Sequence, residues 1–402
     1  MWGNTVDIRR MPLWESRNAT MLQNNLVRMV IEDQGEVSLE LSTRSIHGGI
    51  VNALSLPYYR GTGINVYSDN NYEFWRSKQT VYQAGGIYFT FPNKNEAHIN
   101  ANTSYWMVRR YGTEEKYGGV WRLSELKSRE EGNRFLLTKL ELILPNHPVV
   151  YTLIDCKNLG DETIECMAEV HAMLGAPFLQ CGSLIQTSVN KFIAFPPNLR
   201  EVAVNQYESD VFFTSLDKAP LKKGGLGNAG QVPGITGSYD YIMGEVGQND
   251  LEYITVTNPH LQLCYCMFFP GRTYEDHENI LFPLPNIDLT MNYLGRMDVP
   301  WALYEGGTPQ VYSLTIGAGY MDHNGVFDNP CLYSLEPGDT KRMLYANAFM
   351  PYENTRMNGG YYTMEKGEGT LTMKRTKSTL SFPADYKFEI ISELMAKLKA
   401  DN

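Results

Sequence analysis

A segment near the middle of the chain constrains the fold more than any other part of the sequence. Val149 to Asp155 is a run rich in β-branched and aromatic residues, and residues 158–161 (NLGD) have the composition of a tight turn. From Thr163 to His171 apolar and polar positions then alternate, as they do in a strand with one buried face. The apolar positions are Ile164, Cys166, Ala168 and Val170, and the opposite positions are Glu165, Met167, Glu169 and His171. We expect the apolar face to pack on a second sheet, which leaves His171 facing outward or into a cleft.

Segments of the same kind recur at steady spacing along the chain. They include Tyr105–Val108, Gly119–Leu123, Phe135–Leu144, Leu251–Phe269 and Thr370–Phe382. Because helical segments do not alternate with them, the pattern predicts an all-β fold, a large twisted antiparallel β-sandwich. We expect residues 1–25 to form an irregular lead-in and residues 26–383 a single β-sandwich domain. Residues 384–402 are predicted to end the chain as a short helix.

The helix prediction rests on apolar residues at helical spacing. They are Phe388, Ile391, Leu394, Met395 and Leu398. Such a terminal helix can dock on its own domain, and it can also serve as a contact in a homo-oligomer.

Charge and composition exclude several classes of function for a chain of 402 residues. With a net charge of −10 the chain has no excess of basic side chains to neutralise phosphates, so we expect no nucleic-acid partner. The sequence has neither an apolar run of membrane-spanning length nor a signal segment at its start, which predicts a cytoplasmic protein without a membrane partner. Six cysteines without a C-x-x-C pair are typical of reduced, mostly buried thiols. The 26 tyrosines, 16 phenylalanines and 6 tryptophans favour strands, and exposed aromatic rings can stack on sugars.

Two motifs are formally similar to cofactor sites. Residues 225–230 match G-x-G-x-x-G, but a dinucleotide site needs a helix directly afterwards, and Pro233-Gly234 prevents one. We therefore exclude that site and expect a loop over residues 219–241. Residues 272–278 (RTYEDHE) surround His277 with acids that can ligate a divalent metal, although a solvated charged loop is the simpler interpretation. We predict no cofactor, with a divalent metal at Asp276 or His277 as the alternative.

Two stretches carry a resemblance to a known family. Asn158, Gly160 and Asp161, followed by His171 and then by residues 175–182 (GAPFLQCG), resemble the middle of galactose mutarotase-like (aldose 1-epimerase) proteins. Residues 85–92 (GGIYFTFP) resemble the GGIP-x-x-FP run of this family, and His98 follows them where the family has another active-site histidine. The resemblance extends over most of the chain, and it implies a β-supersandwich and a small-molecule carbohydrate as the substrate.

The resemblance also implies roles for individual residues. His171 would protonate the ring oxygen of the sugar, and His98 would help to hold the same end of it. Arg76 or Arg60 would bind hydroxyl groups, and aromatic side chains such as Tyr274 would orient the ring.

The general base is where the chain departs from the family pattern. The family has a glutamate near the end of a late strand, whereas here the strand from Val311 runs into residues 317–319 (GAG) without an acid. Asp322 and Glu305 are the nearest acids that can replace it.

Three functions remain open at this point. The first is an isomerase that opens or epimerises a sugar ring by acid–base catalysis. The second is a carbohydrate lyase or isomerase of the same fold, with a metal ion as a possible participant. The third is a carbohydrate-binding subunit without catalytic activity.

Overall fold

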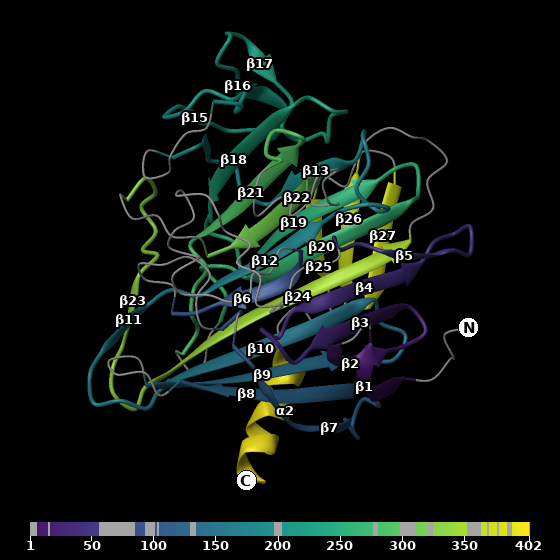
Figure 1. Ribbon diagram of the computed structural model, residues 1–402, viewed down its shortest axis with the longest axis vertical. Helices are drawn as coiled ribbons and strands as arrows, with labels where there is room; N and C mark the ends of the chain where they lie inside the picture. Colours follow the sequence, from purple (N-terminus) through teal and green to yellow (C-terminus); the bar gives the residue numbers. More distant parts are fainter. Residues whose placement is uncertain are drawn as a thin grey trace.

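Alternating apolar and polar side chains fold most of the chain into two stacked antiparallel sheets (Figure 1). The computed structural model describes residues 6–14, 17–55, 85–92, 101–102, 104–128, 134–196, 203–275, 280–297, 311–319, 325–351, 363–367, 370–375, 378–383 and 388–401. The predicted all-β antiparallel sandwich with a C-terminal helix is confirmed.

The larger sheet contains twelve strands. In sheet order they are β1 (Asp7–Trp14), β2 (Arg17–Gln23), β3 (Val27–Glu32), β4 (Ser38–Arg44), β6 (Gly86–Thr90), β12 (Glu169–Leu174), β22 (Tyr312–Ala318), β21 (Asn286–Tyr293), β18 (Ser238–Glu245), β14 (Phe192–Ala194) and β15 (Phe212–Phe213), with β5 (Ile50–Asn52) paired to β4.

The second sheet contains eight strands. In sheet order they are β13 (Leu184–Thr187), β19 (Leu251–Asn258), β20 (Leu263–Pro270), β24 (Thr340–Pro351), β10 (Val149–Asn158), β9 (Phe135–Ile143), β8 (Val120–Lys127) and β7 (Met107–Thr113). Smaller elements are the pairs β11 (Ile164–Cys166) with β23 (Tyr333–Leu335) and β16 (Ala219–Pro220) with β17 (Leu226–Gly227), the sheet of β25 (Thr363–Gly367), β26 (Thr370–Arg375) and β27 (Ser378–Pro383), the 3-10 helix η2 (Leu216–Lys218) and the helix α2 (Glu389–Ala400).

The expected irregular lead-in over residues 1–25 is wrong for the part that the structure describes. Strands β1 and β2 pair with each other, and β2 continues the sheet onto β3. Charged residues of β1 hide its strand pattern in the sequence, and Arg10 bonds to Asp33 beyond β3 with an Nη1–Oδ1 distance of 2.7 Å. Tertiary pairing therefore orders this segment where the local sequence does not.

The segment from Thr163 to His171 forms two short strands rather than one. Strand β11 pairs with β23, whereas β12 lies between β6 and β22 in the larger sheet. The backbone N–H of Met167 donates to the carbonyl of Pro92 at the point where the chain passes from one pairing to the other. The predicted alternation persists through this change, so Val170 and His171 still point to opposite faces of the sheet.

The main apolar core lies between the two sheets. Val170, Ala172 and Ile316 enter it from the larger sheet, and Ile154 and Phe349 enter it from the smaller one. All five side chains are buried. Because the strands alternate, the other face of β12 carries Glu169 and His171, away from this core.

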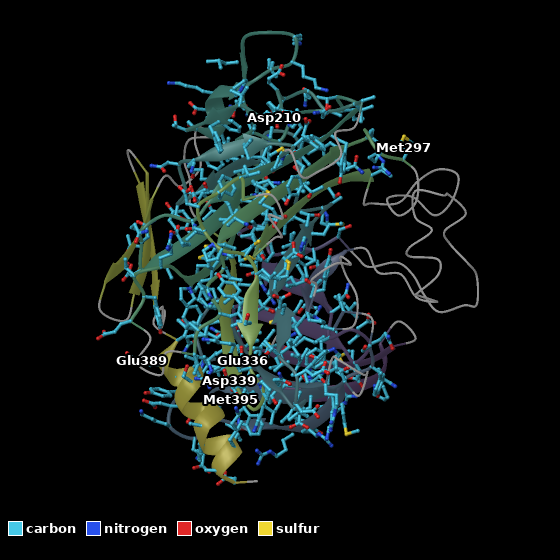
Figure 2. All side chains as sticks on the ribbon, turned by 90° about the vertical axis from the view of Figure 1, so that its left-hand side faces the viewer. Asp210, Met297, Glu336, Asp339, Glu389 and Met395 are labelled. Carbon is cyan, nitrogen blue, oxygen red and sulfur yellow. The ribbon has the colours of Figure 1, made fainter. Side chains whose placement is uncertain are left out.

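A second apolar cluster lies on the outer face of the eight-stranded sheet, where helix α2 covers it. The helix contributes Ile391, Leu394, Met395 and Leu398, and Phe388 packs just before it. Figure 2 shows α2 at the end of the molecule opposite Asp210. The helix thus docks on its own domain, as one of the two alternatives predicted. Among the described helices, none is long and apolar enough to cross a membrane.

The segment over residues 219–241 contains more structure than the predicted loop. It forms the hairpin β16–β17 and leads into β18 at Ser238, while Ala229 and Val232 pack in the main core. Residues 231–237, directly after Gly230, form an isolated bridge and bends.

Candidate active site

A row of side chains crosses the middle of the larger sheet on the face opposite the core. His171 on β12 pairs in register with Tyr88 on β6 and with Gly317 on β22, and Gly317 pairs in turn with Asp288 on β21. Glu169, the adjacent residue of β12 on the same face as His171, pairs with Thr90 on β6. Four neighbouring strands therefore bring an imidazole, two carboxylates and a phenol to one place.

His171 is held directly between its neighbours. Its Nε2 atom forms an ion pair with Glu169 Oε1, and its ring stacks on Tyr88 with 5.2 Å between the centroids and 3° between the planes. Thr90 Oγ1 donates to the other oxygen of Glu169 at 3.3 Å. The histidine is 5% exposed and Glu169 is fully buried, so the imidazole has a defined orientation.

Burial and the neighbouring carboxylates shift the pKa of His171 in opposite directions. Burial disfavours the imidazolium, but the carboxylates of Glu169 and Asp288 outweigh this effect and raise the pKa of His171 to about 9. At neutral pH the ring is therefore protonated and can donate a proton.

Asp288 is a buried carboxyl group whose pKa is higher than that of an ordinary aspartate. Burial raises the pKa of Asp288 to about 7, with His171 lowering it and Glu169 raising it further. Neither carboxylate oxygen has a hydrogen-bond partner within the described part of the chain. Burial and the same two carboxylates also raise the pKa of Tyr88, so that its phenol stays protonated. The row thus combines a proton donor with a carboxylate that can accept a proton near neutral pH.

Two small apolar clusters flank this row. On the side of β6, Tyr88 packs with Val37 and Leu39. On the side of β18, Met243, which pairs with Asp288, packs with Tyr241 and other apolar residues. These walls lower the local dielectric, which strengthens the interactions among the charged groups between them.

The same three charged side chains have the donor set of a metal site. One ligand atom from each of Glu169, His171 and Asp288 lies within 4.8 Å of the other two. Imidazole with two carboxylates is a set that suits divalent transition metals. The sequence analysis placed a possible metal at Asp276 or His277 instead, and both of these lie outside the described residues.

The other predicted site residues have different outcomes. His98, Arg60, Arg76, Glu305 and Asp322 lie outside the described residues, so their roles stay predictions.

Tyr274 packs against Phe388, with 6.5 Å between the ring centroids, in the cluster beneath α2. This cluster is on the outer face of the other sheet, so the prediction that Tyr274 orients a sugar beside His171 is wrong. The local sequence around Tyr274 did not indicate on which face of which sheet its side chain would lie.

Two residues of the row, Glu169 and Asp288, were missed as functional candidates. Glu169 and His171 are two positions apart on a strand, which alone predicts that they share a face. Asp288 lies in an alternating strand, NIDLTMNY, whose polar positions share one face in the same way. What local sequence did not reveal is that β21 lies one strand away from β12.

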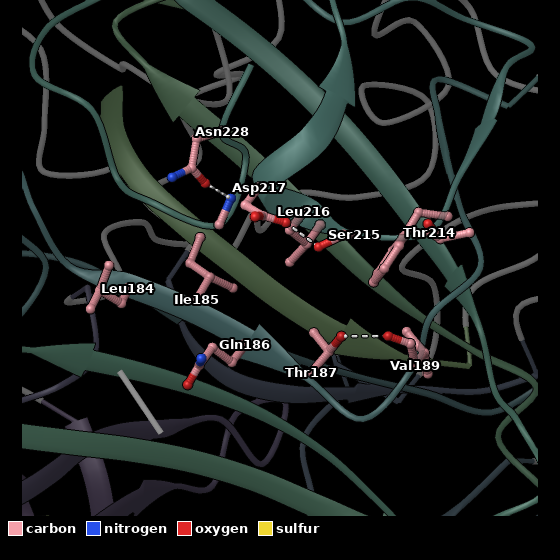
Figure 3. Close-up of a pocket in the computed structure, with 12 residues that line it drawn as sticks. Leu184, Ile185, Gln186, Thr187, Val189, Thr214, Ser215, Leu216, Asp217 and Asn228 are labelled. Carbon is pink, nitrogen blue, oxygen red and sulfur yellow. Dashed lines mark hydrogen bonds between the residues drawn. The ribbon is translucent and has the colours of Figure 1, made fainter. Parts of the chain in front are cut away.

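Figure 3 shows a separate hollow of about 400 Å³ between β13 and the segment around η2. Two of its polar side chains serve local structure. Thr187 Oγ1 donates to the carbonyl of Val189 at 3.3 Å, and Asn228 Oδ1 accepts from the N–H of Gly230 at 2.9 Å. The residues that line the hollow include no histidine and a single carboxyl group, Asp217, so it lacks the imidazole and paired carboxylates of the His171 row.

Comparison with known proteins relates the chain to others through its fold. No protein-family model matches the sequence, and no curated protein does. A galactose mutarotase-like protein from Clostridium acetobutylicum aligns with 87% of this chain and 100% of its own, at a TM-score of 0.53 and 12% identity. An aldose 1-epimerase candidate from Klebsiella pneumoniae aligns with 86% of this chain and 83% of its own, at a TM-score of 0.54 and 12% identity.

A TPR-domain containing protein from Parabacteroides distasonis aligns with 95% of this chain but only 54% of its own, at a TM-score of 0.52 and 11% identity. At these identities the similarity concerns the fold. The two stacked antiparallel sheets of this chain therefore have the galactose mutarotase-like architecture that its sequence motifs resemble.

Proposed function

We propose that the chain is a carbohydrate-active isomerase of aldose 1-epimerase type, which opens and recloses a sugar ring by acid–base catalysis. The observation that supports it is the His171 imidazole held between two buried carboxylates on the exterior face of β12, in a galactose mutarotase-like fold. The substrate class comes from the fold and from the sequence resemblance.

The proposed reaction assigns a separate task to each group. The His171 imidazolium donates its proton to the ring oxygen while Asp288 accepts the proton of the anomeric hydroxyl. The bond between the anomeric carbon and the ring oxygen breaks, which gives an open-chain aldehyde with no net gain or loss of protons. Rotation of the aldehyde group and closure on its other face then return both protons to their donors. Glu169 does not exchange a proton in this scheme, because its role is to hold the imidazolium in place.

Asp288 takes the role for which the sequence analysis considered Asp322 and Glu305. We assign this role to Asp288 because one of its carboxylate oxygens lies within 4.8 Å of a ring nitrogen of His171. Asp322 and Glu305 lie outside the described residues. Following the resemblance, we assign His98 and either Arg60 or Arg76 to binding of the sugar hydroxyls. Four of the six cysteines, Cys156, Cys166, Cys264 and Cys266, have buried side chains, as is typical of reduced thiols, and this is the basis for proposing a cytoplasmic location.

Anomer exchange measured by nuclear magnetic resonance across a panel of aldoses tests this function. Loss of a general acid or base typically costs 10²–10⁴-fold, so His171→Ala and Asp288→Asn should each slow exchange by at least about 100-fold. Asp240→Asn is the matched control, because Asp240 is also fully buried in the larger sheet but is hydrogen-bonded to Gln206. Equal exchange rates in wild type and His171→Ala would refute the proposal.

A second candidate function follows from the donor set of Glu169, His171 and Asp288. A divalent metal bound there would support a metal-dependent isomerase or lyase acting on a sugar derivative. Metal content of the purified protein, with activity before and after chelation, separates the two functions. Sugar binding that survives His171→Ala, without turnover in the wild type, would instead indicate a carbohydrate-binding subunit.

A further inference from the structure

One backbone position separates the strands that carry His171 and Asp288. Gly317 on β22 pairs with His171 on one side and with Asp288 on the other. Neighbouring strands lie about 4.8 Å apart, so the backbones at His171 and Asp288 are about 10 Å from each other. An aspartate has a short side chain, and it can approach the imidazole only by leaning over the strand between them.

The space above Gly317 is where this approach takes place. A Cβ atom added to Gly317 would lie 2.2 Å from Asp288 Oδ1 and 2.9 Å from both Cγ and Oδ2. The carboxylate of Asp288 therefore occupies the volume that a side chain at position 317 would fill. Such a contact is far inside van der Waals distance, so any larger residue at this position must displace the carboxylate or the strand.

We propose that Gly317 is a positioning residue whose missing side chain allows the Asp288 carboxylate to reach across β22 toward His171. Its effect on catalysis rests on the proposed function, whereas its effect on the His171–Asp288 pair does not. The proposal explains how His171 can have a carboxylate partner although the neighbouring strand, β22, carries no acid. The carboxylate belongs to Asp288 on β21, the strand beyond β22.

Titration of His171 followed by nuclear magnetic resonance tests the proposal without a substrate, with EDTA present in every sample so that no metal ion bound by Glu169, His171 and Asp288 affects the pKa. Among the described residues, the titratable groups that face this imidazole are Tyr88 on β6, Glu169 on β12 and Asp288 on β21. In Gly317→Ala the displaced carboxylate no longer supports the imidazolium, so the pKa of His171 should fall by ~1 unit or more. Gly234→Ala is the control, because a Cβ atom there meets nothing within 4 Å, and it should leave the pKa unchanged.

Moving the carboxylate by one strand distinguishes positioning from a merely structural role. The double variant Gly317→Ala/Asp288→Gly removes the collision and the carboxylate together, so it should fold like the wild type while the pKa of His171 stays low. The exchange variant Gly317→Asp/Asp288→Gly places a carboxylate directly opposite His171 and should restore a high pKa.

Two results would overturn the inference. One is a folded Gly317→Ala protein in which the pKa of His171 equals that of the wild type. The other is an exchange variant whose pKa for His171 stays as low as that of Gly317→Ala/Asp288→Gly. These outcomes are separate from the fate of the proposed function, since the titration can behave as expected in a protein that exchanges no aldose, and an active protein can have an unaltered titration in Gly317→Ala.

Discussion

Removing the charge of Arg122 should destabilise this protein strongly, because the buried carboxylates of Glu36 and Glu141 would lose a partner. Arg122 on β8 is fully buried, and it binds both oxygens of Glu36, which lies in the turn between β3 and β4, at 2.5 and 2.6 Å. Glu141 and Lys139 on β9 join the same cluster, with 2.7 Å between Lys139 Nζ and Glu141 Oε1. These contacts connect the two stacked sheets through ion pairs that water does not reach.

The expected loss in the free energy of unfolding follows from the Glu36 carboxylate that stays buried once Arg122 is replaced. Burial opposes the charge of Arg122, but Glu36 and Glu141 outweigh burial and raise the pKa of the guanidinium, so it stays charged. In Arg122→Met the carboxylate of Glu36 remains buried with only part of its compensation. Breaking a buried ion pair by removing one partner typically costs about 3–5 kcal/mol in the free energy of unfolding, and we expect a loss in this range.

Urea denaturation followed by tryptophan fluorescence measures this loss, because Trp106 and Trp121 are buried in the sandwich. Arg109→Met is the control. Arg109 forms an ion pair with Glu125 across 2.6 Å, but its side chain is 47% exposed, and pairs of this kind contribute about 0–1 kcal/mol.

The double variant Arg122→Met/Glu36→Gln should be more stable than Arg122→Met alone, since it removes the uncompensated carboxylate as well. The reasoning is refuted if Arg122→Met costs no more than Arg109→Met, or if adding Glu36→Gln destabilises it further.

Three further predictions concern pH and metal ions. Exchange of anomers needs Asp288 ionised and His171 protonated, so the rate should rise as pH passes about 7 and fall as it passes about 9, and a rate that stays flat from pH 6 to 10 would argue against this pair. Burial lowers the pKa of His147 from 6.5 to about 4, so the neutral ring stabilises the fold above pH 6.5, and a contribution on the order of 3 kcal/mol should be lost as pH falls toward 4. His147→Gln should flatten the unfolding free energy over this interval, and an unchanged pH dependence would show that another group is responsible. Chelation with EDTA should leave the exchange rate unaltered if His171 acts as an acid, whereas a loss that Zn²⁺ or Mn²⁺ restores would favour the metal-dependent alternative.

Local patterns were sufficient for features that depend on neighbouring residues. The alternation from Thr163 to His171 predicted that Val170 would face a core and that His171 would not, and the inner cluster contains Val170. Helical spacing near the end of the chain likewise predicted which residues of α2 are buried. Both succeeded because a side chain's direction repeats with a short period within its own element.

What only the tertiary structure decided is which elements lie side by side. The order of strands in the larger sheet places β22 next to β12 and β21 on the far side of β22, and the register then aligns Gly317 and Asp288 with His171. The same applies to the N-terminal strands, whose pairing with β3 orders a segment without a clear pattern of its own. The sequence by itself determined the faces of the strands, whereas pairing between distant segments decided which side chains meet, because register depends on the packing of the whole sheet.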